Sequence, residues 1–292
     1  MKTEEAIEVF LEAKVGVRAP KTIKWYKGNL KLFLDFIGEN KEIESVSIHE
    51  LRRWRAKLTR QKLTPWTIHG YLRAVKYFFN WLNNEKILNT NPTKRLELPR
   101  LPKIPRQGIL DIDRDSMLEI ARSFERPRDY AILIFAATTG CRENGLATLK
   151  VRNLDIENMQ ALVTEKGMKS RIVFFEEGTK NALIKWLEIR STASNENVFI
   201  TREGEPLTTS GIYQVFKRIA LRAGVRKKWN PHQWRHAFAR NFLKNGGDIG
   251  ILSQLLGHSD IRVTLDHYGG LTNRELQMAH SKYAPRLNMT NI

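Results

Sequence analysis

Residues 231–268 read PHQWRHAFARNFLKNGGDIGILSQLLGHSDIRVTLDHY and combine helical patterns with four side chains suited to chemistry. His232 and Arg235 follow an Asn-Pro pair, which is typical of a helix start, and lie one helical turn apart on one face. His258 follows a Leu-Leu-Gly ending, and Tyr268 comes ten residues later. Each of the four side chains is therefore predicted near the end of a helical segment, where a turn of the backbone exposes it.

The residues before this stretch predict helices and one β-hairpin. Residues 130–138 are an apolar run long enough for a buried helix, and Arg142 follows the Thr-Gly pair that ends it. Residues 161–164 and 171–175 are rich in strand-forming types and flank a glycine-containing loop that carries Lys166. The predicted fold class is α+β: mainly α with a small β-sheet or hairpin.

The amino-terminal part predicts a separate helical bundle. Thr3 precedes an acidic first turn, Ser47–Glu50 has the pattern of a capping box, and Thr64 followed by proline marks another helix start. Gly38 suits a helix end. Apolar residues recur at helical spacing in four segments: Ile7, Phe10 and Leu11; Ile23, Tyr26, Leu30, Phe33, Leu34 and Ile37; Leu51, Trp54 and Leu58; Ile68, Tyr71, Leu72, Val75, Phe78, Phe79 and Leu82. Residues 1–92 are therefore predicted to form a four-helix domain.

A basic, proline-rich segment separates the two predicted domains. Proline stiffens the chain and removes hydrogen-bond donors, so residues 93–106 are expected to form an extended linker. Residues 107–292 then form the second domain, which ends in a short helix at about residues 273–283. A helix this short is marginal alone, so its apolar face is expected to dock either on its own domain or on a neighbouring copy.

The composition favours a nucleic acid as partner. The 292 residues include 49 Lys and Arg against 31 Asp and Glu, a formal charge of +18. A merely basic protein and a protein lying on anionic membranes are the alternatives. The candidate contacts to DNA phosphates, which could instead be only solvated charges, are Lys24, Lys27, Arg52, Arg53, Arg55, Lys94 and Arg95. Without a secretory signal or a bilayer-length apolar run, the expected location is the cytoplasm, on DNA and not on a membrane.

Several common chemistries lack their motifs. The single cysteine, Cys141, excludes a disulfide framework and a thiolate-bound metal cluster. The sequence has neither a Gly-rich phosphate loop ending in Gly-Lys-Ser/Thr nor a His-Glu-x-x-His helix. The acids of residues 111–115 could bind Mg²⁺, but their place before an apolar helix favours a role in capping it and in balancing its dipole. We expect no metal and no other cofactor.

Five short motifs resemble those of the tyrosine recombinase, or phage integrase, family. In the family's order they are residues 138–142 (TTGCR), 165–171 (EKGMKSR), 231–236 (PHQWRH), 255–259 (LLGHS) and 264–268 (TLDHY). The resemblance extends over nearly the whole chain. It implies a site-specific DNA recombinase of the two-domain type, in which a helical core-binding domain and a catalytic domain close as a clamp on DNA.

Tyr268 stands at the place of the family's nucleophile. A free tyrosine has a pKa of about 10, so it attacks a phosphodiester at neutral pH only if a base takes its proton and cations stabilise the phenolate. Arg142 and Arg235 match the family's two arginines, and guanidinium groups can hold the phosphate bidentately as its negative charge grows. His258 is expected to be a third donor to that phosphate.

Two further residues are expected to move protons. Lys166, on the hairpin loop, is predicted to protonate the leaving 5′ oxygen as a general acid. His232 is predicted to accept the proton of Tyr268 or to position it, although a structural histidine is the alternative. The resulting 3′-phosphotyrosine conserves the energy of the broken bond, so rejoining by a 5′ hydroxyl requires neither ATP nor metal.

Three positions depart from the family's pattern. The family commonly has a glutamate three residues after its first arginine, but Gly145 stands there, while Glu143 adjoins Arg142 directly. The carboxylate support of Arg142 is therefore an open question. Trp234 and Ala237 replace an aliphatic residue and a threonine, and these changes are expected to affect packing more than chemistry.

The resemblance also implies an assembly. A chain that is monomeric in isolation would form a homotetramer on double-stranded DNA with paired half-sites and exchange strands through a Holliday junction, in integration, excision or the resolution of chromosome dimers. A type IB topoisomerase-like relaxing enzyme and a catalytically silent DNA-binding regulator are the alternatives. The target site, the direction of reaction and any accessory protein lie beyond what the sequence indicates.

Overall fold

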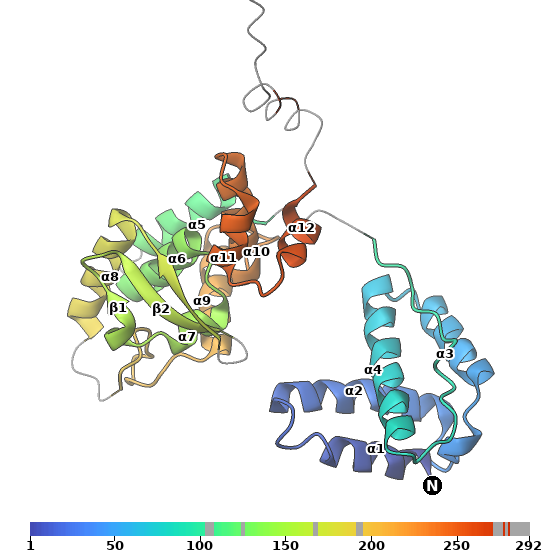
Figure 1. Ribbon diagram of the computed structural model, residues 1–292. Helices are drawn as coiled ribbons and strands as arrows, with labels where there is room; N and C mark the ends of the chain where they lie inside the picture. The colour runs from blue at the N-terminus through green and yellow to red at the C-terminus, as the bar shows by residue number, and fades with distance from the viewer. Residues whose placement is uncertain are drawn as a thin grey trace, which may run out of the picture. The chain divides into compact units, whose positions relative to one another are not determined.

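The computed structural model describes residues 1–102, 108–123, 126–165, 169–190 and 195–270, together with Gln277 and His280. The chain divides into two compact units, Met1–Lys103 and Ile104–Ile292 (Figure 1). No helix in these described ranges is both long enough and apolar enough to cross a membrane.

The first unit is a bundle of α-helices, as predicted. Its helices are α1 (Thr3–Glu12), α2 (Pro20–Ile37), α3 (Ile48–Arg60) and α4 (Pro65–Asn84), with a 3₁₀ turn at Ile43–Ser45. The predicted capping box of Ser47 and Glu50 is present, Thr64 caps α4, and Gly38 ends α2. Thr3 is the first residue of α1 and precedes its acidic residues Glu4 and Glu5, as predicted, and its hydroxyl donates to the carbonyl of Lys41 at 2.7 Å.

The chain beyond α4 packs back on this bundle. Leu96 is buried in its apolar core, and Leu98 packs against that core. The backbone here also accepts hydrogen bonds from the bundle: Lys76 donates to the carbonyl of Leu96, and Arg55 donates to that of Glu97, both at 3.0 Å. Residues 93–98 of the predicted linker are therefore held by the first unit, whereas residues 103–106 lie outside the described chain.

The second unit is mainly helical with one small sheet. Its helices are α5 (Asp111–Ser123), α6 (Pro127–Thr139), α7 (Glu143–Thr148), α8 (Glu177–Arg190), α9 (Thr209–Arg222), α10 (Pro231–Lys244), α11 (Ile249–Leu256) and α12 (Ile261–Tyr268), with a 3₁₀ turn at Val151–Asn153. The predicted hairpin is formed by β2 (Gln160–Glu165) and β3 (Lys169–Phe174), and a short β1 (Leu154–Asp155) makes the sheet three-stranded and antiparallel in the order β1-β2-β3. The α+β prediction is confirmed.

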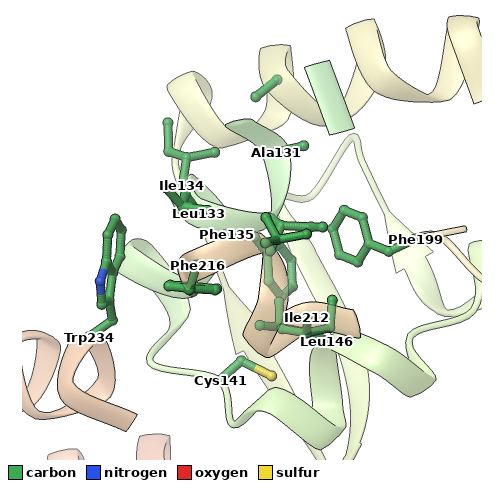
Figure 2. Packing of buried hydrophobic residues seen from close by; sticks show 14 of the residues in the cluster. Ala131, Leu133, Ile134, Phe135, Cys141, Leu146, Phe199, Ile212, Phe216 and Trp234 are labelled. Carbon is green, nitrogen blue, oxygen red and sulfur yellow. The ribbon is translucent and has the colours of Figure 1, made fainter. Parts of the chain in front are cut away.

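A large apolar core fixes the elements that carry the motifs. Figure 2 shows Phe135 of α6, Phe216 of α9 and Trp234 of α10 converging on this core, together with Phe199. The rings of Phe216 and Trp234 meet edge to face with centroids 5.2 Å apart. Burial of large aromatic rings contributes strongly to stability, so this contact holds α9 and α10 firmly together.

Two other expectations concern the ends of this unit. The acids of residues 111–115 lie in the first turns of α5, where Asp111 accepts a hydrogen bond from Asn241 at 2.9 Å and pairs with Arg114 at 2.7 Å. Their place in the first turn suits the predicted balancing of the helix dipole, but they lie within the helix and not before it, so the predicted cap is not what they form. Of the predicted helix at about residues 273–283, the structure describes only Gln277 and His280, both in helical conformation.

Candidate active site

Arg142 is presented by the sharp turn between α6 and α7. Gly140 ends α6 in the left-handed conformation, with φ 59°, and Arg142 is the N-cap of α7 two residues later. A Cβ at Gly140 would lie 2.5 Å from the ring of Phe238, so both the conformation and the close approach require glycine. The Arg142 side chain keeps 33% of its surface exposed, so it can reach a ligand from solvent.

Glu165, the last residue of β2, joins three arginines. Its side chain is only 5% exposed, and its two carboxylate oxygens face Arg142, Arg171 and Arg235. Arg142 contacts Oε2 through Nη1, while Arg171 Nη2 lies 3.0 Å and Arg235 Nη1 3.5 Å from Oε1. Three guanidinium groups against one carboxylate leave a net charge of +2, which suits an anionic group such as a phosphate.

Arg235 links the ends of three elements. Its side chain is 2% exposed, and Nη1 donates to the carbonyl of Gly140 at 2.9 Å, while Nη2 donates to that of Leu256 at 2.5 Å. Burial first, and then the charges of the neighbouring arginines, lower the pKa of Arg235 to about 9. The guanidinium still carries its charge at neutral pH.

His258 adjoins Arg235 and is held by a second partner. Its Nε2 lies 3.1 Å from Arg235 Nη2, and its Nδ1 lies 2.7 Å from the hydroxyl of Thr264. A guanidinium can only donate, so Nε2 accepts and the proton of the neutral ring belongs on Nδ1. Burial first, and then the positive charge of Arg235, lower the pKa of His258 to about 4, so the ring is neutral at pH 7. To donate to a phosphate through Nε2, His258 must first gain a proton there.

Tyr268 lies at the end of α12, packed against α10. The side chain is 8% exposed, and its hydroxyl is hydrogen-bonded to Nδ1 of His236. The ring of His232 packs edge-on against His236, with centroids 4.4 Å apart. The helix of Tyr268 is tied to the arginine cluster, because Thr264 of α12 is bonded to His258, which adjoins Arg235.

Sequence reasoning therefore missed three residues of this cluster. Glu165, Arg171 and His236 all lie inside the quoted motifs, but none was singled out. The signal for His236 was its position four residues after His232, on the same helical face. Arg171 gave no such local signal, because its contacts are with Glu165 and with the backbone of Leu255. Lys166 lies outside the described residues.

The candidate DNA contacts of the first unit differ in exposure. Lys24 and Lys27 of α2, Arg52 and Arg53 of α3, and Lys94 and Arg95 after α4 are exposed. Arg55 is partly buried and its guanidinium is already bonded to the carbonyl of Glu97. The described ranges contain no group of three or more His, Cys, Asp or Glu side chains able to hold a metal.

Comparison with known proteins gives matches over both units. The profile of the phage integrase family matches residues 111–274, and that of the phage integrase N-terminal SAM-like domain matches residues 8–86. The tyrosine recombinase XerC of Alcanivorax borkumensis is 31% identical, over 90% of this chain and 88% of that protein. The tyrosine recombinase XerD of Listeria monocytogenes is 28% identical, over 95% of this chain and 96% of that protein.

A solved structure shares the fold. The integrase of the Tn1549 transposon, in complex with transposon right end DNA, matches with a TM-score of 0.80 at 20% identity. The match covers 98% of this chain and 100% of the integrase chain in that structure. Fold, site and matches define the class of protein as a tyrosine recombinase. The chain belongs to the phage integrase family, and the prediction of a site-specific recombinase is confirmed. Neither a relaxing enzyme nor a silent regulator is favoured by these matches.

Proposed function

We propose that this recombinase cleaves DNA by attack of the Tyr268 hydroxyl on a phosphodiester that is bound at the arginine cluster. The observation that carries the proposal is the gathering of Arg142, Arg171 and Arg235 round Glu165. Tyr268 is tied to this cluster through its own helix, α12, whose Thr264 is bonded to His258 beside Arg235. The net positive charge of the cluster supports stabilisation of the charge that grows on the non-bridging oxygens.

The proposed cleavage forms one bond, breaks one bond and moves two protons. The oxygen of Tyr268 forms a bond to phosphorus, the bond to the 5′ oxygen breaks, and the product is a 3′-phosphotyrosine. His236 accepts the proton of Tyr268, since it is the ring in contact with the hydroxyl, and His232 packs behind it. Lys166 donates a proton to the leaving oxygen. A 5′ hydroxyl from another strand reverses the steps and rejoins the DNA, so the proposed reaction requires no cofactor.

The test of this function is covalent trapping. A nicked DNA site loses the short strand that carries the 5′ hydroxyl, so rejoining is blocked and a protein–DNA adduct accumulates. Sequencing the DNA that co-purifies with the trapped adduct identifies the site. An adduct that maps to Tyr268 supports the proposal, and the absence of any adduct on the DNA that the protein binds most tightly contradicts it.

We propose that the exposed basic residues of the first unit bind DNA phosphates. Each phosphate contact contributes about 0.9 to the slope of log affinity against log salt concentration. Replacing Arg52, Arg53 and Arg55 by Ala should therefore flatten the slope by up to roughly three contacts' worth. Arg55 should contribute least, because its guanidinium is already bonded to Glu97. An unchanged slope would mean that these arginines face solvent only, and Arg152→Ala, an exposed arginine of the second unit, is the matched control.

We propose further that four copies assemble on two paired half-sites and that the segment after Tyr268 joins them. Leu276, Ala279 and Tyr283, outside the described residues, lie at helical spacing. A head-to-tail contact of such a helix with a neighbour closes a ring only at the right rotation. Deleting residues 273–292 should leave a folded monomer that binds one half-site but forms no four-subunit complex in a gel-shift series. Normal complexes would refute this docking, and a collapsed helical signal in circular dichroism would place the helix on its own domain.

A further inference from the structure

We infer that Glu165 is the positioning residue of the arginine cluster. We infer also that strand β2 can supply this carboxylate because Gly145 has no side chain that would extend toward the same space. This inference rests on the proposed function of the cluster. Within the described chain, every ion pair made by Arg142, Arg171 or Arg235 is with Glu165. These arginines come from the α6–α7 turn, from β3 and from α10, so one carboxylate connects three separate elements.

The cluster needs this carboxylate for electrostatic reasons. Arg171 and Arg235 are 11% and 2% exposed, and each neighbouring guanidinium disfavours the charge of the next. A buried carboxylate between them offsets the repulsion and fixes where each planar group points, since it accepts hydrogen bonds in defined directions. Its single negative charge leaves two positive charges for the phosphate. Glu165 therefore acts through the arginines and need not touch the DNA.

Gly145 explains why the carboxylate can come from the strand. Gly145 lies in α7, where a glycine is unfavourable by about 1 kcal/mol relative to alanine. Its backbone does not have positive φ, so conformation does not require glycine. A Cβ there would clash with Sγ of Cys141 and would lie 3.8 Å from Cγ of Glu165. A glutamate at residue 145 would thus extend toward the space that Glu165 occupies, and the two buried carboxylates would repel each other.

The first experiment replaces the charge and keeps the shape. On the nicked site at saturating DNA, Glu165→Gln should form the covalent adduct roughly 100-fold more slowly than the wild type, the effect of a small misplacement of reacting groups. Half-site affinity should change little, because the substitution leaves the proposed phosphate contacts of the first unit intact. All rates are measured below the melting temperature of each variant, since loss of a buried ion-pair partner also lowers stability.

A second substrate separates positioning from structural damage. A methylphosphonate at the cleaved position lacks one negative charge and therefore depends less on the arginines. The ratio of wild-type to Glu165→Gln rates should shrink on this substrate. The same ratio on both substrates would overturn the inference, because it would mean that the Glu165→Gln substitution causes a general loss of folded enzyme and not a loss of arginine alignment.

The decisive experiment moves the carboxylate between the two positions. Glu165→Gly and Gly145→Glu should each be slow, whereas the exchange of both, made in a Cys141→Ala background to clear the clash with Sγ, should recover much of the rate. Cys141→Ala alone is the matched control and should form the adduct at nearly the wild-type rate. An exchange variant that is no faster than the slower single variant would overturn the inference. A wild type that forms no adduct would instead refute the proposed function.

Discussion

Tyr268→Phe will bind DNA with unchanged affinity and form no covalent adduct. The substitution removes one oxygen, the atom that bonds to phosphorus, and keeps the ring that packs beside α10. The adduct yield on a nicked site should fall below detection, whereas the gel-shift affinity for the same DNA should match that of the wild type. The lost hydrogen bond to His236 should lower the free energy of unfolding by about 1 kcal/mol, which a denaturant titration measures.

The control for this result is a second tyrosine. Tyr283 is the next tyrosine downstream, so Tyr283→Phe is the matched variant and should retain the adduct. An adduct formed by Tyr268→Phe would disprove the assignment of the nucleophile and make Tyr283 the candidate. His236→Ala offers an independent check, because the proposed proton acceptor should affect the rate of attack and leave DNA affinity unchanged.

Lys166→Ala should slow cleavage of ordinary DNA by roughly 10²–10⁴-fold, the range that a general acid contributes. A substrate with sulfur in place of the 5′-bridging oxygen should restore most of the rate, because a thiolate leaves without a proton. The measurement is the rate of adduct formation on the two substrates at saturating DNA. Lys169→Ala, on the same hairpin, is the matched control and should show no sulfur rescue. An equal loss on both substrates would mean that Lys166 has another role.

Local patterns predicted most elements well. The capping box at Ser47 and Glu50, the helix start at Thr64 and the hairpin at β2 and β3 all depend on residues close together in sequence. The hydrogen bond from the Thr3 hydroxyl to the carbonyl of Lys41 was not predictable in this way, because a contact over 38 residues leaves no pattern at the helix start.

The site was predictable only in part. The motifs singled out Arg142, Arg235, His258 and Tyr268, which the structure brings into one cluster with Glu165. The same motifs pointed to His232 as partner of the nucleophile, whereas the hydroxyl of Tyr268 contacts His236. The two histidines share one helical face, so spacing alone could not choose between them. The choice depends on where α12 packs against α10.

The sequence by itself determined most of the helices, the motifs that carry part of the site and the family to which the chain belongs, because motifs, caps and apolar spacing are local properties. Only the tertiary structure decided which groups touch. The bond from Arg235 to Gly140 spans 95 residues, and its approach to Glu165 spans 70. The sequence left the support of Arg142 open at Gly145, and the fold placed Glu165 of β2 against that arginine. Contacts over such separations arise from packing of the core, which no spacing along the chain encodes.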